Sequence, residues 1–133
     1  MRHCPGKEEP DASPLVVDDE PSVFHFIHDY FTPKGYDVTA AATGAEGLRR
    51  LREERPHLLL LDIILPDMDG RKVLREAKAI DPALSVIMLT GVVDEAIGRQ
   101  ALRAGAFDYV TKPVDLKYLD RVVWYKLAQM TIG

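Results

Sequence analysis

Apolar and polar positions follow one another along the chain in short blocks of two kinds. Four leucines in a row, residues 58–61, lie between Pro56 and Pro66, and a run this short and this apolar is typical of a parallel strand buried on both faces. Residues 15–17 and 85–89 are apolar runs of similar character. Between these runs, apolar residues recur at helical spacing. The pattern therefore predicts strands that alternate with helices.

Five strands and five helices are predicted in this way. The strands cover residues 15–17, 36–40, 58–61, 85–89 and 107–110, and the helices cover residues 21–32, 44–54, 71–80, 93–104 and 115–129. Strict alternation indicates an α/β fold in which helices cover both faces of a doubly wound parallel sheet. Right-handed crossovers leave few strand orders open. The flavodoxin-like (βα)5 arrangement, with strand order 2-1-3-4-5, is the usual five-stranded solution.

Length and charge narrow the class of protein. The 133 residues suit one domain. Residues 1–13 carry charges, prolines and no hydrophobic period, so we expect a flexible N-terminal extension followed by a domain at residues 14–133. A net charge of −4 argues against direct nucleic-acid binding, which needs a basic face. The single cysteine, Cys4, and the lack of a membrane-length apolar run favour a cytoplasmic protein without membrane contact.

Acidic residues directly follow two of the predicted strands. Asp62 closes the leucine run, and Asp18, Asp19 and Glu20 follow residues 15–17. The three acids in a row could simply be a solvated helix start, because negative charge suits a helix N-terminus. In strand order 2-1-3-4-5, however, strands one and three are neighbours at the switch point. Asp18 and Asp19 should then face Asp62 across one cleft.

Two more strand ends should reach this cleft, since Thr90 follows residues 85–89 and Lys112 lies just beyond residues 107–110. Carboxylates that repel one another either raise a pKa or recruit a cation, and an open, oxygen-only site suits Mg²⁺. An aspartate such as Asp62 is ionised at neutral pH and can attack phosphorus without an activating base. The Lys112 ammonium and the Thr90 hydroxyl would then contact the phosphoryl oxygens. The pattern thus predicts a magnesium-dependent phosphoryl-transfer site.

Four segments carry a resemblance to a known family. They are residues 16–20 (Val-Val-Asp-Asp-Glu), residues 60–70 (Leu-Leu-Asp-Ile-Ile-Leu-Pro-Asp-Met-Asp-Gly), residues 89–91 (Leu-Thr-Gly) and residues 104–113 (Ala-Gly-Ala-Phe-Asp-Tyr-Val-Thr-Lys-Pro). The order and spacing of these segments resemble those of the receiver domain of bacterial two-component response regulators. Within that family the resemblance is to receiver domains similar to the chemotaxis regulator. The resemblance covers about residues 14–130. Four motifs on one cleft are far more specific than any single motif.

The resemblance implies a role for each matching position. Asp62 corresponds to the phosphoacceptor, which takes a phosphoryl group from a phosphohistidine of a sensor kinase. Other positions correspond to ligands of Mg²⁺, to contacts of the phosphoryl group and to a conformational switch. The implied metal ligands are Asp18, Asp19, Asp62 and the main-chain carbonyl of Ile64; the phosphoryl contacts are Thr90 and Lys112; the switch pair is Thr90 and Tyr109; and the peptide bond before Pro113 is cis.

The resemblance also implies a signalling domain and not an enzyme, with only weak self-phosphorylation and self-dephosphorylation. The implied partners are a sensor histidine kinase or phosphotransfer protein and a downstream protein or covalently linked output domain. We expect phosphorylation to switch a surface formed by the fourth helix, the fifth strand and the fifth helix, on which a phosphorylation-dependent homodimer could also form. Apolar Ile64 and Val92, two residues beyond Asp62 and Thr90, predict slow self-dephosphorylation because they cannot orient a water molecule.

Two other classes of protein share parts of this pattern. A haloacid-dehalogenase-like phosphatase also places an aspartate after a buried strand, but here the pair Asp67 and Asp69 lies five or more residues beyond Asp62, past a proline. A flavin- or nucleotide-binding domain of the same topology usually has a glycine-rich loop after strand one, where this chain has three acids. Beryllofluoride with Mg²⁺ separates the three, because only a receiver or a phosphatase should bind it and only a phosphatase should hydrolyse free phosphate esters.

Overall fold

The computed structural model describes residues 13–91 and 95–132. A five-stranded sheet with the order β2-β1-β3-β4-β5 forms its centre, and every pair of neighbouring strands is parallel. The strands are β1 Pro14–Val17, β2 Thr39–Ala41, β3 Leu58–Asp62, β4 Ser85–Thr90 and β5 Asp108–Thr111. The helices are α1 Pro21–Phe31, α2 Gly44–Glu54, α3 Gly70–Ile80, α4 Glu95–Arg103 and α5 Leu116–Ile132, with a 3₁₀ turn, η1, at Thr32–Lys34. The predicted α/β, flavodoxin-like fold is confirmed.

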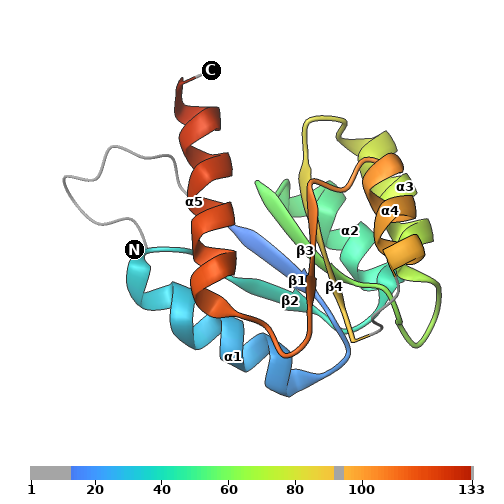
Figure 1. Ribbon diagram of the computed structural model, residues 1–133, viewed down its shortest axis with the longest axis horizontal. Helices are drawn as coiled ribbons and strands as arrows, with labels where there is room; N and C mark the ends of the chain where they lie inside the picture. Colours follow the sequence, from blue (N-terminus) through green and yellow to red (C-terminus); the bar gives the residue numbers. More distant parts are fainter. Residues whose placement is uncertain (1–12, 92–94, 133) are drawn as a thin grey trace.

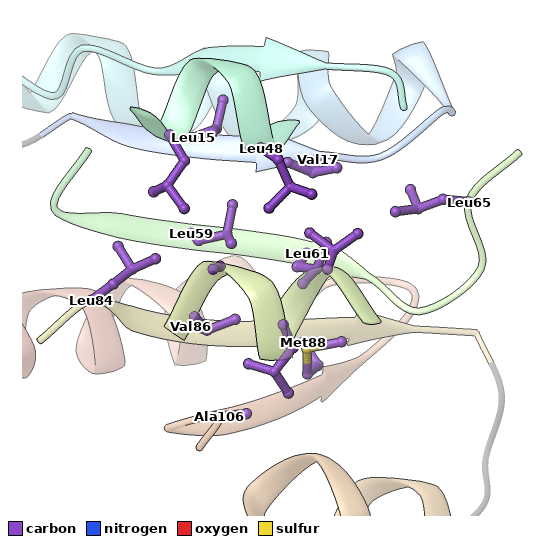
Figure 2. Close-up of a cluster of buried hydrophobic side chains, with 14 of the residues drawn as sticks. Leu15, Val17, Leu48, Leu59, Leu61, Leu65, Leu84, Val86, Met88 and Ala106 are labelled. Atoms are coloured by element: carbon purple, nitrogen blue, oxygen red, sulfur yellow. The ribbon is translucent and has the colours of Figure 1, made fainter. Parts of the chain in front are cut away.

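Helices cover both faces of the sheet, so that the three central strands, β1, β3 and β4, are buried along their whole length. Helices α1 and α5 lie on one face and α2, α3 and α4 on the other (Figure 1). Successive side chains of a strand point to opposite faces: Leu59 and Leu61 pack with Leu48 of α2 (Figure 2), whereas Leu60 packs with Phe31 of α1. A strand covered on both faces needs apolar residues at every position, which explains the unbroken leucine run.

The second strand is the main correction to the predicted elements. A strand was expected at residues 36–40, but β2 covers Thr39–Ala41. Gly35 adopts a left-handed backbone with φ 100° after η1, a conformation that glycine adopts without strain. Tyr36 follows in the same turn, where its ring packs edge-on against Phe31 with 5.3 Å between centroids. Tyr36 therefore serves the core beside α1 and not the sheet ladder.

The other boundaries differ from the predicted ones by at most three residues. Asp62 and Thr90 each belong to the strand that they were expected to follow, and β5 begins at Asp108, one residue later than expected. Gly105 has φ 110° and ends α4 as predicted. The first residues of the predicted helix 93–104 and almost all of the predicted extension 1–13 lie outside the described ranges. In the part of the chain that is described, no helix has both the length and the apolar character that a membrane crossing requires.

Candidate phosphoryl-transfer site

The carboxyl ends of β1, β3 and β5 bring three charged side chains into contact. Asp18 and Asp62 are each 5% exposed, and the Nζ atom of Lys112 lies 2.9 Å from Asp18 Oδ2 and 3.0 Å from Asp62 Oδ2. The second oxygen of each carboxylate accepts a main-chain hydrogen bond. Glu20 N donates to Asp18 Oδ1 at 2.9 Å, and Ile64 N donates to Asp62 Oδ1 at 3.1 Å. Both carboxylates are thus held in fixed orientations around one ammonium group.

The sheet register explains why these residues meet. Asp62 of β3 lies beside Leu89 of β4, and Thr90 lies beside Thr111 of β5. The Lys112 main-chain N–H donates to Thr90 O at 2.7 Å, which continues the ladder by one residue. The peptide bond between Lys112 and Pro113 is cis, the isomer that the family resemblance implies. Because the strands are parallel and in this register, their carboxyl ends bring these side chains to the same end of the sheet.

The loop after β3 closes tightly over the backbone of Asp62. Gly70 N donates to Ile63 O at 2.6 Å, and Ile64 forms an antiparallel bridge with Asp69. A Cβ atom on Gly70 would lie 2.0 Å from the Asp62 carbonyl oxygen, far inside van der Waals contact. Glycine at this position thus allows the loop to return directly to the backbone at the end of β3.

Glu20 is a site residue that the strand-end argument misses. Its Oε1 atom lies 2.8 Å from Lys112 Nζ, so three carboxylates surround the ammonium. Asp18, Glu20 and Asp62 each offer one oxygen, and these oxygens lie within 4.8 Å of one another, close enough to hold a metal ion together. Glu20 is the residue immediately before α1, and the run of three acids was the only sequence signal for it. Asp19 is exposed and lines the pocket beside this group.

An open pocket of about 490 Å³ lies in front of Asp62. Its walls come from the loop after β1, the loop after β3 and the ends of β4 and β5. The lining residues are Asp19, Glu20, Asp62, Ile64, Leu65, Pro66, Gly91 and Lys112. The pocket has room for a phosphoryl group with its hydration and gives direct access to the Asp62 carboxylate.

Burial and charge act in opposite directions on the titrating groups. Burial raises the pKa of Asp18, and the nearby Asp62 charge adds to this, while Lys112 and the Glu20 N–H lower it in part. Burial alone would lower the pKa of Lys112, but its contacts with Glu20, Asp18 and Asp62 outweigh burial and raise that pKa. Lys112 therefore stays charged at neutral pH, and its ammonium neutralises part of the negative charge of the cleft.

Asp18 Oδ2 has the environment of a metal ligand. It is buried and accepts no well-aligned hydrogen bond from the described residues, even though Lys112 Nζ lies 2.9 Å away. Buried oxygen atoms without a hydrogen bond are rare in folded proteins. Hard cations with oxygen ligands satisfy such carboxylates. The acidic group of Asp18, Glu20 and Asp62 could therefore hold a metal ion.

Thr90 and Tyr109, the expected switch pair, lie on neighbouring strands. Thr90 is buried at the end of β4. Tyr109 of β5 is half-buried, lies beside Met88 in the register and packs against the core under α2, α3 and α4. Its ring lies against Gly98 of α4, and Tyr109 does not line the pocket in front of Asp62.

Comparisons with known proteins show to which family the chain belongs. The sequence profile of the response regulator receiver domain matches residues 15–123, and the chain belongs to this family. The regulatory protein AtoC of Escherichia coli is 37% identical over 109 residues, which are 82% of this chain and 24% of AtoC. The transcriptional regulatory protein KdpE of Mycobacterium tuberculosis is 44% identical over 99 residues, which are 74% of this chain and 43% of KdpE.

Solved structures show the same architecture. A CheY-like receiver domain protein from Methanospirillum hungatei superposes with a TM-score of 0.85 at 34% identity, over 90% of this chain and 96% of that one. NtrX from Brucella abortus gives a TM-score of 0.85 at 29% identity, over 92% of this chain and 28% of NtrX. The chain thus spans about a quarter to a half of the length of the regulatory proteins that it matches.

Proposed function

We propose that Asp62 accepts a phosphoryl group from a phosphohistidine of a sensor histidine kinase or of a phosphotransfer protein. The observation that carries the proposal is the contact between Lys112 Nζ and Asp62 Oδ2 at 3.0 Å, on the wall of an open pocket. A nucleophilic carboxylate beside a fixed positive charge is what phosphoryl transfer needs, because positioning and charge neutralisation dominate its catalysis. Membership of the receiver family supports the same role.

The side chains divide the reaction between them. A carboxylate oxygen of Asp62 attacks phosphorus, the P–N bond of the phosphohistidine breaks, and an acyl phosphate forms while the imidazole leaves. The Ile64 N–H, 3.1 Å from Asp62 Oδ1, fixes the carboxylate in one orientation. Lys112 is placed to bind a phosphoryl oxygen, since its ammonium already contacts Asp62. In this proposal the Thr90 hydroxyl binds another phosphoryl oxygen.

The proposed cofactor is Mg²⁺, held by Asp18, Asp19, Asp62 and the main-chain carbonyl of Ile64. When bound, it would supply positive charge to the phosphoryl oxygens. The buried Asp18 Oδ2, with no well-aligned hydrogen bond in the described chain, and the oxygen-only donor set support a hard cation. Asp19 lines the same pocket, which supports its proposed role as a ligand.

Labelling with a small phosphodonor tests the phosphoacceptor. With acetyl phosphate and Mg²⁺, mass spectrometry should detect one added phosphoryl group, and Asp62→Asn should abolish it. Asp67→Asn is the matched control, because Asp67 lies in the same loop but its carboxylate binds the start of α2. Labelling of the Asp62→Asn variant at the parent level would rule out the assignment. Beryllofluoride with Mg²⁺ should bind the parent, and hydrolysis of free phosphate esters would favour a phosphatase instead.

For the output, we propose a switch surface on α4, β5 and α5. Five large apolar or aromatic side chains of α4, α5 and the loop just before β5 are exposed: Leu102, Phe107, Tyr118, Trp124 and Tyr125. The rings of Phe107 and Tyr125 stack with 6.5 Å between centroids, and Lys126 Nζ lies 4.3 Å from the centre of the Phe107 ring. Single exposed apolar residues are common, but exposed aromatic rings that adjoin, as Phe107 and Tyr125 do, support an interaction site.

The proposed partners of this surface are a downstream protein, a linked output domain or a second phosphorylated copy, in the cytoplasm. The regulatory proteins among the relatives are longer than this chain, which supports a linked output. Thr90 and Tyr109 would connect the phosphorylated pocket to α4. Amide exchange at residues 95–110 should change when beryllofluoride and Mg²⁺ are added to the parent, and unchanged exchange there would argue against the switch surface.

A further inference from the structure

Lys112 lies where a metal ion would bind. One oxygen each of Asp18, Glu20 and Asp62 lies within 2.8 to 3.0 Å of its Nζ atom. Mg²⁺ binds carboxylate oxygens at about 2.0–2.1 Å. To bind the oxygens of Asp18 and Asp62 that Lys112 now contacts, it would have to occupy almost the position of the ammonium group. Two positive charges at such a separation repel each other strongly. The Lys112 ammonium must therefore lose at least its contact with Asp18 when the metal binds.

The three carboxylates differ in how far they are free to move. The side chains of Asp18 and Asp62 are 0% and 7% exposed, whereas the side chain of Glu20 is 57% exposed. Glu20 lines the pocket and also a second surface pocket with Phe26 and Pro113. It is therefore the one of the three acids that can follow the ammonium outward from the buried pair.

We propose that Glu20 is a positioning residue that keeps hold of the Lys112 ammonium when Mg²⁺ takes Asp18 and Asp62. The inference rests on the proposed function, because it assumes that Mg²⁺ binds to Asp18, Asp62 and the other proposed ligands. Glu20 lowers the cost of moving Lys112 off the buried carboxylates and keeps the ammonium at the pocket, next to the position of the phosphoryl group. Glu20 thereby tunes the affinity for Mg²⁺ through Lys112 and not as a metal ligand.

A double-mutant cycle separates these two roles. Calorimetry gives the Mg²⁺ dissociation constant of the parent chain, Glu20→Gln, Lys112→Met and the double variant, with circular dichroism to verify that each is folded. In the parent, Glu20→Gln should weaken Mg²⁺ binding about five- to tenfold, because Lys112 then competes more strongly for Asp18 and Asp62. In the Lys112→Met background, the same substitution should change the dissociation constant less than about twofold, since the competing ammonium is gone.

A control variant removes the effect of net charge alone. Glu53→Gln removes one negative charge near the end of α2, where Glu53 pairs with Arg49. This end of α2 leads into the start of β3, away from the carboxyl ends of the strands. It should leave Mg²⁺ affinity unchanged. Equal weakening by Glu20→Gln with and without Lys112 would overturn the inference and make Glu20 a direct ligand. If the parent binds no Mg²⁺ and gains no phosphoryl group at Asp62, the proposed function itself fails, and the inference fails with it.

Discussion

The aromatic ring of Tyr109 packs directly on Gly98 of α4. A Cβ atom on Gly98 would lie 2.6 Å from both Cε1 and Cζ of the ring, so no larger residue fits while the ring keeps this position. Glycine inside a helix costs about 1 kcal/mol relative to alanine. Glycine at position 98 therefore lowers helix stability but allows Tyr109 to pack closely against α4. This contact joins α4 to β5 within the proposed switch surface.

The contact predicts that Gly98→Ala has opposite effects in two backgrounds. In the parent the added methyl group should push on the ring and lower the free energy of unfolding by about 1–2 kcal/mol. In a Tyr109→Ala chain the clash is absent, so the better helix propensity should raise that free energy by about 1 kcal/mol. Urea unfolding of the four chains measures both effects. An effect of the same sign and size in both backgrounds would show that the ring contact does not matter.

A second prediction concerns the glycine behind the phosphoacceptor. Gly70→Ala places a methyl group 2.0 Å from the Asp62 carbonyl oxygen, so the loop after β3 must shift and we expect a loss of about 3 kcal/mol or more in unfolding free energy. Gly91→Ala is the matched control, because no atom lies within 4 Å of its Cβ position. It should change stability by less than about 0.5 kcal/mol. Equal stability of the two variants in urea would contradict the tight loop.

The fold could be predicted from the sequence because local and long-range requirements coincide in it. The leucine run of β3 can be satisfied only by burial on both faces, and this requirement implies the helices that cover them. The predicted position of the second strand was wrong because tyrosine has a high strand propensity, whereas the ring of Tyr36 packs beside Phe31. A high strand propensity means that a residue suits a pleated, half-buried surface; it does not mean that the residue belongs to the sheet.

The site was predictable to the same degree as the sheet order. Strand ends have fixed places, so Asp18, Asp62 and Lys112 could be expected to meet, and the structure brings them within 3.0 Å. The role of Glu20 could not be derived in this way, because a long side chain at the start of a helix can point in several directions. Its contact with Lys112 depends on rotamers that strand order does not determine.

A third prediction is a pH dependence of stability from Asp67. Main-chain N–H groups of Ala45 and Gly44 donate to its carboxylate and hold its pKa below the usual value of 3.8. A carboxyl group with a lowered pKa in the folded state stabilises the fold above its unfolded pKa and loses this effect as the pH falls through the folded pKa. The Asp67→Asn variant should therefore unfold at a lower urea concentration than the parent at pH 7.

The difference between the two chains should shrink as the pH falls below 3.8, the ordinary value for Asp67. Urea midpoints of both chains from pH 7 to pH 3 measure it. Asp81→Asn is the control for the substitution itself. It makes the same chemical change at the end of α3, where the Asp81 carboxylate accepts a hydrogen bond from Ala83 N. A parent-to-Asp67→Asn difference that stays constant over this range would show that the charge of Asp67 contributes nothing through the α2 terminus.

A fourth prediction concerns the lifetime of the proposed acyl phosphate. Ile64 lies two residues beyond Asp62 on the pocket wall and is 63% exposed, whereas Val92, the other expected shielding residue, lies outside the described ranges. An apolar side chain at this place cannot orient an attacking water by hydrogen bonding. Ile64→Asn should speed phosphate loss on the order of tenfold, less than full general acid-base catalysis supplies.

The measurement is phosphate loss over time from chains phosphorylated at Asp62, at saturating Mg²⁺. Phe26→Asn is the matched control, because it makes the same kind of apolar-to-amide change at an exposed residue of α1 that neither lines the pocket in front of Asp62 nor belongs to the proposed switch surface. It should lose phosphate at the parent rate. If Ile64→Asn also keeps the parent rate, Ile64 does not shield the acyl phosphate. The lifetime would then depend on other groups at the site, of which Lys112, 3.0 Å from Asp62, would be the first to examine.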